Sequence, residues 1–138
     1  MQIVTRGNCH LDAHMVRAAL AQLDMDRVGV LVIENVGNLV CPAGWDLGED
    51  LKVVVVSTTE GDDKPAKYPQ IFAASAAMII NKIDLLPYVS YSIDRVRQFA
   101  LRVNPNLRIF ELSCTSGQGM DAWCDWLLNV ARGFPTLA

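Results

Sequence analysis

The chain is 138 residues long, with 51% hydrophobic and 20% charged residues, a composition typical of a globular domain with a buried core. Its net charge of −3 and its scattered Lys and Arg side chains argue against a nucleic-acid partner. Its apolar runs are far shorter than the roughly 18–20 residues of a membrane-spanning helix, and its N-terminus lacks a signal-peptide pattern. With four cysteines and no other sign of secretion, we expect a cytoplasmic chain with reduced thiols and no membrane partner.

Helical patterns alternate along the chain with apolar runs of strand length. The runs lack a regular alternation of apolar and polar residues, as in buried parallel strands. We expect helices at residues 11–23, after an N-cap at Ser92, and around the C-terminal tryptophans. We expect strands at residues 28–33, 53–56, 76–80 and 107–112. This order predicts an α/β fold, a mostly parallel sheet flanked by helices, in a single domain over residues 1–138.

Polar clusters follow several of the predicted strands. Glu34 ends the first long run, residues 81–84 end the third and residues 113–117 end the fourth. Because ligands of open α/β sheets bind beyond the carboxyl ends of the strands, these clusters are expected to converge on one ligand.

The sequence Asn81-Lys82-Ile83-Asp84 has the chemistry of a guanine-binding loop. One Asp84 carboxylate can accept both the N1–H and the 2-amino group of guanine, a donor pair that adenine lacks. The Lys82 stem can lie along the base, Asn81 can brace the loop, and a backbone N–H of Ser113-Cys114-Thr115-Ser116-Gly117 can reach the guanine O6. The alternative is a polar turn in which Asp84 caps the following segment.

Cys9, His10 and Cys41 are candidate metal ligands. Two thiolates and one imidazole suit zinc or nickel far better than magnesium or calcium, and the set does not rank one of the two above the other. Three protein ligands leave a fourth position for water, a partner residue or a second copy of the chain. The alternative is that each cysteine is a small buried hydrophobic residue.

The remaining thiols and the second histidine are expected to have other roles. His14 lies four residues after His10, at helical spacing, and is predicted to be an exposed helix residue. Cys114 in the predicted base loop and Cys124 on the last helix are interpreted as structural.

The run that ends at Glu34 is similar to the magnesium-binding strand of nucleotide triphosphatases, although an ordinary acid at a strand end gives the same pattern. Its usual partner, a Gly-x-x-x-x-Gly-Lys-Ser/Thr run that cradles phosphates, does not occur in these 138 residues. Hydrolysis of GTP needs charge neutralisation around the phosphates, so we expect these residues alone to hydrolyse GTP near the background rate.

Four motifs, in this order, resemble the hydrogenase nickel-incorporation GTPases of the HypB family: GNCHLDAHMV, ENVGNLVCPAGWDLGE, GDDKPAKYP and NKIDLLPY. The resemblance extends from Gln2 to about Ala131. It implies a P-loop GTPase that handles nickel, and also binds zinc, while nickel–iron hydrogenase matures. It further implies GTP or GDP with magnesium as ligands, a homodimer, and hydrogenase maturation proteins and the hydrogenase large subunit as partners.

The resemblance also assigns residues by position. Cys9, His10 and Cys41 match the metal ligands of the family, and Glu34 matches the end of its magnesium-binding strand. The base-recognition residues match Asn81, Lys82 and Asp84, and the last loop matches Ser113, Cys114 and Thr115 through Gly117.

The first strand and the phosphate-binding loop of the family are missing from this sequence, so the resemblance implies a truncated G domain that associates with itself or closes its sheet differently. We keep three interpretations. They are a metallochaperone GTPase, a metal-binding or dimerisation fragment without hydrolysis, and a related GTPase, such as a urease-accessory type, in which the Cys-His pair is incidental.

Overall fold

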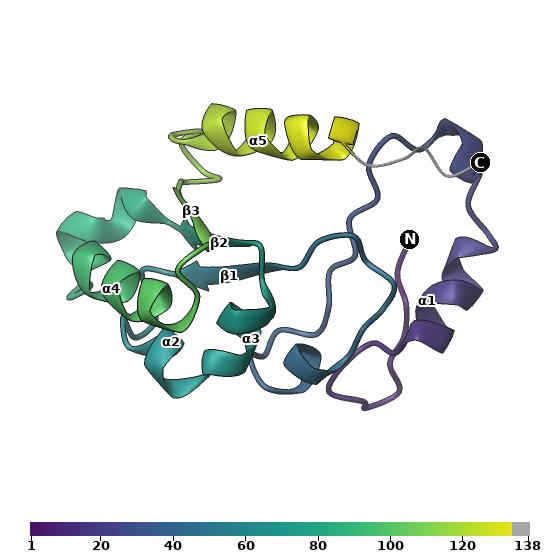
Figure 1. The fold of residues 1–138 in the computed structure, drawn as a ribbon, viewed down its shortest axis with the longest axis horizontal. Coiled ribbons are helices and arrows are strands. Elements are labelled where there is room, and N and C mark those ends of the chain that lie inside the picture. Colours follow the sequence, from purple (N-terminus) through teal and green to yellow (C-terminus); the bar gives the residue numbers. More distant parts are fainter. Residues whose placement is uncertain (134–138) are drawn as a thin grey trace. The chain divides into compact units, whose positions relative to one another are not determined.

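The computed structural model describes residues 1–133, and the chain divides into two compact units, Met1–Asp50 and Leu51–Ala138 (Figure 1). Each unit is described by itself. The expectation of a single domain over residues 1–138 stays a prediction.

The second unit is built on a parallel sheet of β1 (Val53–Ser57), β2 (Ala77–Asn81) and β3 (Arg108–Glu111), in the order β1-β2-β3. Val54 pairs with Met78, and Met78 pairs with Ile109. Residues 77–80 of the central strand are all buried, which explains the unbroken apolar run in the sequence. These three strands confirm the prediction for residues 53–56, 76–80 and 107–112.

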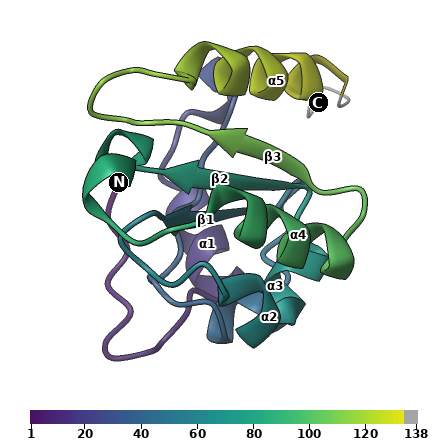
Figure 2. The ribbon, with the colours of Figure 1, turned by 90° about the vertical axis from the view of Figure 1, so that its left-hand side faces the viewer.

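Helices connect the strands and lie beside the sheet (Figures 1 and 2). The connections between strands carry α2 (Lys64–Lys67), α3 (Pro69–Ala74) and α4 (Ile93–Val103), and α5 (Met120–Gly133) follows β3. The predicted N-cap is confirmed, because the Ser92 hydroxyl accepts a hydrogen bond from the Arg95 N–H at 3.2 Å. Val96 and Ala100, which share the apolar face of α4, are fully buried.

Two neighbouring residues of β3 show that α4 and α5 cover opposite faces of the sheet. Glu111 accepts a hydrogen bond from Arg97 of α4 at 2.7 Å. Phe110 instead packs against Trp123 and Trp126 of α5, with ring centroids 5.4 Å apart in both pairs. Because successive side chains of a strand point to opposite faces, these contacts place one helix on each side, as Figure 1 also shows.

The first unit consists mainly of loops around α1 (Ala13–Leu20). The Asp12 carboxylate caps this helix by accepting a hydrogen bond from the Met15 N–H at 2.8 Å. Short 3-10 helices follow at Met25–Arg27 and Cys41–Gly44. The helix predicted at residues 11–23 is therefore present but shorter.

The prediction of a strand at residues 28–33 is wrong. This segment is irregular, Val32 is 77% exposed, and the sheet found in residues 1–133 contains β1, β2 and β3 alone. An apolar β-branched run favours a strand, but a strand also needs a neighbour for its N–H and C=O groups, and residues 28–33 have none in that sheet.

A further finding is that no helix within the described range could span a bilayer.

Candidate functional site

The thiols of Cys9 and Cys41 meet in the first unit, although the residues are 32 positions apart. Their Sγ atoms are 2.8 Å from each other, and the Cys9 Sγ is 3.6 Å from the Nδ1 of His10. A left-handed turn at Arg6 and Gly7, with φ of 50° and 91°, leads into Cys9. Cys41 begins a 3-10 helix that continues with Pro42, whose ring fixes the backbone there.

The sulfur–sulfur distance is intermediate between a disulfide and a metal-bound pair. A disulfide bond is about 2.0 Å long, whereas two thiolates bound to tetrahedral zinc at about 2.3 Å lie about 3.8 Å apart. Cys9 and Cys41 are free thiols. Within the described part of the chain, no group of three or more His, Cys, Asp and Glu side chains is arranged to hold a metal ion. The donor types therefore fit a soft metal, but the sulfur atoms must separate by about 1 Å to bind one.

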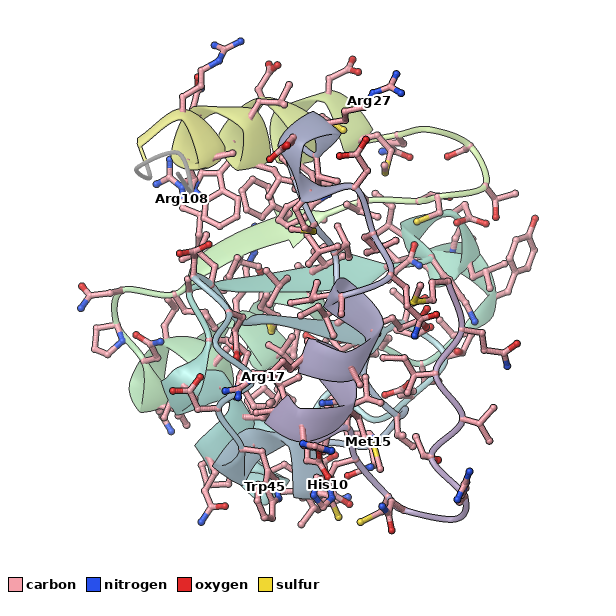
Figure 3. The ribbon with its side chains drawn as sticks, turned by 90° about the vertical axis from the view of Figure 1, so that its right-hand side faces the viewer. His10, Met15, Arg17, Arg27, Trp45 and Arg108 are labelled. Atoms are coloured by element: carbon pink, nitrogen blue, oxygen red, sulfur yellow. The ribbon has the colours of Figure 1, made fainter. Side chains whose placement is uncertain are left out.

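The His10 ring has a further contact that the sequence did not suggest. It stacks on the Trp45 ring, with a centroid distance of 4.5 Å and an interplanar angle of 15°. Figure 3 shows His10 and Trp45 side by side. This stacking holds the imidazole beside the thiol pair and shields one of its faces.

The environment of Cys41 changes the pKa of its thiol. The hydrogen bond with Cys9 raises the pKa of the Cys41 thiol above its ordinary value, and desolvation adds to the rise. Both thiols must lose their protons to act as metal ligands, so metal binding at this pair releases protons.

Two asparagines join the loop of Cys9 to the loop of Cys41. The Asn35 side-chain oxygen accepts a hydrogen bond from the Leu11 N–H at 2.8 Å. Asn38 donates from Nδ2 to the Cys9 carbonyl at 2.7 Å and accepts at Oδ1 from the Cys41 N–H at 2.8 Å. The sequence suggested Asn35-Val36-Gly37-Asn38 as a nucleotide-sensing turn and did not indicate that these two asparagines join the loops of the predicted metal ligands.

The second unit contains the predicted base loop, directly after β2. The Asn81 Oδ1 accepts hydrogen bonds from the Lys82 N–H at 2.7 Å and the Cys114 N–H at 3.2 Å, so Asn81 braces the loop as predicted. Lys82 has a φ of 64°, a left-handed conformation that is rare outside glycine and asparagine. Thr58, which follows β1 and is buried, donates from its hydroxyl to the Lys82 carbonyl at 2.7 Å. Thr58 was also missed, because a Thr after an apolar strand is not a specific pattern.

Asp84 has an unused acceptor. Its Oδ1 atom is buried and has no hydrogen-bond partner among the described residues. The predicted alternative was that Asp84 caps the following segment, but Asp84 lies within the 3-10 helix Ile83–Tyr88, whose N-cap position is Lys82. An unpaired buried carboxylate oxygen is costly unless a ligand supplies the donor.

The loop after β3 lies beside the base loop. The Ile83 N–H donates to the Leu112 carbonyl at 3.3 Å, which joins the two loops. Ser113 is fully buried, and its hydroxyl accepts from the Ser116 N–H at 3.1 Å, whereas Cys114 and Thr115 are exposed. The structure thus brings the 81–84 and 113–117 clusters together.

Three other predicted positions have different outcomes. Glu34 lies in the first unit, is exposed and does not follow a strand, so its expected place at a strand end is wrong and its magnesium role stays a prediction. His14 is exposed on α1, as expected. Cys124 is exposed on α5.

Comparison with known proteins identifies the family. Residues 1–111 match the family model described as CobW/HypB/UreG, nucleotide-binding domain. The chain belongs to this family. Its α/β architecture with a parallel sheet is the predicted one, and the suspected relation to HypB proteins is confirmed.

Relatives of this chain include hydrogenase maturation factor HypB of Escherichia coli K12, which is 53% identical over 127 residues. That match covers 92% of this chain and 44% of the relative, so the chain spans less than half of that protein. A crystal structure of HypB from Archaeoglobus fulgidus is 41% identical, with a TM-score of 0.85, and covers 91% of this chain and 67% of that one. HypB from Helicobacter pylori, crystallised in complex with nickel, is 33% identical with a TM-score of 0.91, covering 100% of this chain and 67% of that one.

Proposed function

We propose that this chain is the metal-binding and guanine-binding part of a nickel metallochaperone GTPase that serves hydrogenase maturation. The single observation that carries the proposal is the approach of the Cys9 and Cys41 thiols to 2.8 Å across 32 positions, with His10 beside them. The Helicobacter pylori relative that binds nickel supports nickel as the cargo. Zinc remains a second candidate, because it accepts the same ligands.

The buried Asp84 oxygen supports the nucleotide half of the proposal. Guanine would supply the missing donors to Asp84, while the Asn81 brace holds the loops after β2 and β3 together. A magnesium ion near Glu34 belongs to the same proposal, and hydrolysis by residues 1–138 alone is still expected to stay near background. We also propose a homodimer, with hydrogenase maturation proteins and the hydrogenase large subunit as partners in the cytoplasm.

Titration of the purified chain with Ni²⁺ and, separately, with Zn²⁺ tests the metal half. We expect one strong site per chain, seen for nickel as a thiolate-to-metal charge-transfer absorption. Cys9→Ala and Cys41→Ala should abolish this binding near neutral pH, because each removes a soft ligand. His10→Ala should weaken it, and sedimentation of the same samples shows whether the metal promotes a dimer.

Cys124→Ala is the matched control, since Cys124 is an exposed thiol on α5 in the other unit. It should bind nickel like the unchanged chain. Equal loss of binding in the Cys124 variant, or no binding by the unchanged chain, would overturn the assignment.

A further inference from the structure

Asn38 contacts both residues that carry the candidate metal-binding thiols. Its Nδ2 donates to the Cys9 carbonyl at 2.7 Å, and its Oδ1 accepts from the Cys41 N–H at 2.8 Å and the Val40 N–H at 3.1 Å. One planar carboxamide is thus bonded to the backbones of two residues that are far apart in sequence. The group uses its donor for one loop and its acceptor for the other, which is possible because an amide carries both.

Neither the loop of Cys9 nor the loop that leads into Cys41 forms a helix or strand where Asn38 makes these hydrogen bonds. Cys9 lies in a bend before α1, and Asn38 and Val40 lie in an irregular segment before the 3-10 helix at Cys41. Loops held by few hydrogen bonds open easily, and keeping distant segments together costs conformational entropy. The Asn35 bond to Leu11, at 2.8 Å, gives a second point of attachment between the same two loops.

We infer that Asn38 is a positioning residue, which holds the backbones of Cys9 and Cys41 together so that a shift of the two sulfur atoms by about 1 Å is enough for both thiols to bind one metal ion. The inference rests on the proposed function and adds a residue to it. Asn38 does not touch the metal in this arrangement. It acts through the backbone of each ligand residue, as outer-shell groups of metal sites do.

A simpler role for Asn38 must be separated from this one. Its Oδ1 bonds to Val40 and Cys41 form a local turn of the kind that Asp side chains stabilise equally well. Only the N–H of the amide reaches across to Cys9. Asn38→Asp keeps the local turn but places a second acceptor oxygen against the Cys9 carbonyl, so it removes the connection between the loops.

The experiment uses the full chain with Cys114→Ser and Cys124→Ser in every sample, so that Cys9 and Cys41 are the only thiols. Ni²⁺ affinity is measured by charge-transfer absorption. A second, metal-free measurement follows the Cys9–Cys41 disulfide at equilibrium with glutathione. There the two thiols pass two electrons and two protons to oxidised glutathione, which becomes two reduced glutathione molecules, and the equilibrium reports how closely the thiols are held.

Asn38→Asp and Asn38→Ala should each weaken Ni²⁺ binding by about 10–100-fold, the usual effect of an outer-shell change. Both should also lower the disulfide equilibrium constant by about 10-fold, the effect of losing roughly 1.4 kcal/mol of hydrogen bonding. Asn106→Ala, at an exposed asparagine of the other unit, should change neither value.

Asn38→Asp is the decisive variant. Its added negative charge would by itself strengthen the binding of a cation, so weaker Ni²⁺ binding must come from the lost connection between the loops. Wild-type values for Asn38→Asp in both measurements would overturn the inference and leave Asn38 as a turn residue. If Asn38→Ala fails to fold by circular dichroism, Asn38→Asp alone gives the answer. A chain that binds no Ni²⁺, but whose disulfide equilibrium falls in both variants, would support the positioning role and refute the proposed function.

Discussion

Single polar atoms without partners are the most informative features at the scale of the residue. Asp84 Oδ1 and Tyr91 Oη are both buried and lack a hydrogen-bond partner in the described residues. The two have different consequences. Asp84 lies in the loop that Asn81 braces, which is the predicted base site, whereas Tyr91 lies near the acidic side chains of Glu60 and Asp62.

Tyr91 is expected to make the free energy of unfolding change with pH in the alkaline range. Burial, with smaller effects of Asp62 and Glu60, raises the pKa of Tyr91 to about 12, above the value of about 10 in an unfolded chain. A raised pKa in the folded state means that the stabilising effect is complete below pH 10 and is lost as pH rises from about 10 to 12. Tyr91→Phe should therefore reduce the loss of stability in this range.

At pH 7 the phenol is neutral in both states, so Tyr91→Phe should raise the free energy of unfolding by about 1 kcal/mol through removal of an unpaired hydroxyl. Urea unfolding at pH 7 and at several values above pH 10 measures both effects. Tyr88→Phe is the control, because Tyr88 is 82% exposed. A Tyr91→Phe protein with the same alkaline sensitivity as the Tyr88→Phe protein would contradict the prediction.

At the scale of elements, the loop after β3 depends on two glycines. Gly117 and Gly119 have φ angles of 82° and 75°, which disfavour other residues. A Cβ on Gly119 would lie 2.1 Å from the Glu111 carbonyl oxygen of β3, whereas a Cβ on Gly117 would meet no described atom within 4 Å. The close approach at Gly119 packs the loop onto the end of the strand, beside the predicted base site.

The two glycines therefore predict different costs. Gly117→Ala should lower the free energy of unfolding by roughly 1–2 kcal/mol, the cost of a left-handed residue. Gly119→Ala should lower it by about 2–5 kcal/mol, because backbone overlap adds to the same cost. Thermal and urea unfolding of the two variants gives the comparison, and equal costs would show that the contact with Glu111 does not matter.

At the scale of the whole molecule, the two units differ in their cores. Among the buried apolar side chains of the described chain, Leu11, Val16 and Pro42 belong to the first unit, and the others belong to the second. The first unit relies on hydrogen bonds such as those of Asn35 and Asn38, which contribute about 0.5–1.5 kcal/mol each. The second unit combines a buried central strand with helices on both faces.

Native-state hydrogen exchange should reveal this difference. Amides of β2 should exchange slowest, near the rate set by global unfolding, because they belong to a buried ladder. Amides of residues 28–33 should exchange much faster, since the segment is irregular and lies outside the sheet. Mass spectrometry of peptic fragments measures both regions, and comparable protection would mean that residues 28–33 pair with a partner strand.

Local patterns in the sequence were sufficient for most of the second unit. Apolar runs predicted β1, β2 and β3, and in the central strand β2 the run is unbroken because that strand is buried on both faces. The outer strands are less buried, since Val55 of β1 is exposed and β3 contains Arg108 and Glu111. Ser92 predicted the start of α4, because a cap depends on residues within one turn. The pattern Asn81-Lys82-Ile83-Asp84 predicted a polar loop braced by Asn81 directly after β2, which the structure shows, and its binding of a guanine base stays a prediction.

Features that depend on residues far apart in the sequence were decided only by the tertiary structure. The run at residues 28–33 has the composition of a strand but no neighbour in the sheet, and composition cannot supply one. Cys9, His10 and Cys41 were predicted as ligands from their chemistry and from the family resemblance, and that role stays a prediction. Only the folded chain shows that Asn38 joins the backbones of Cys9 and Cys41, because hydrogen bonds across 29 positions leave no periodic trace in the sequence.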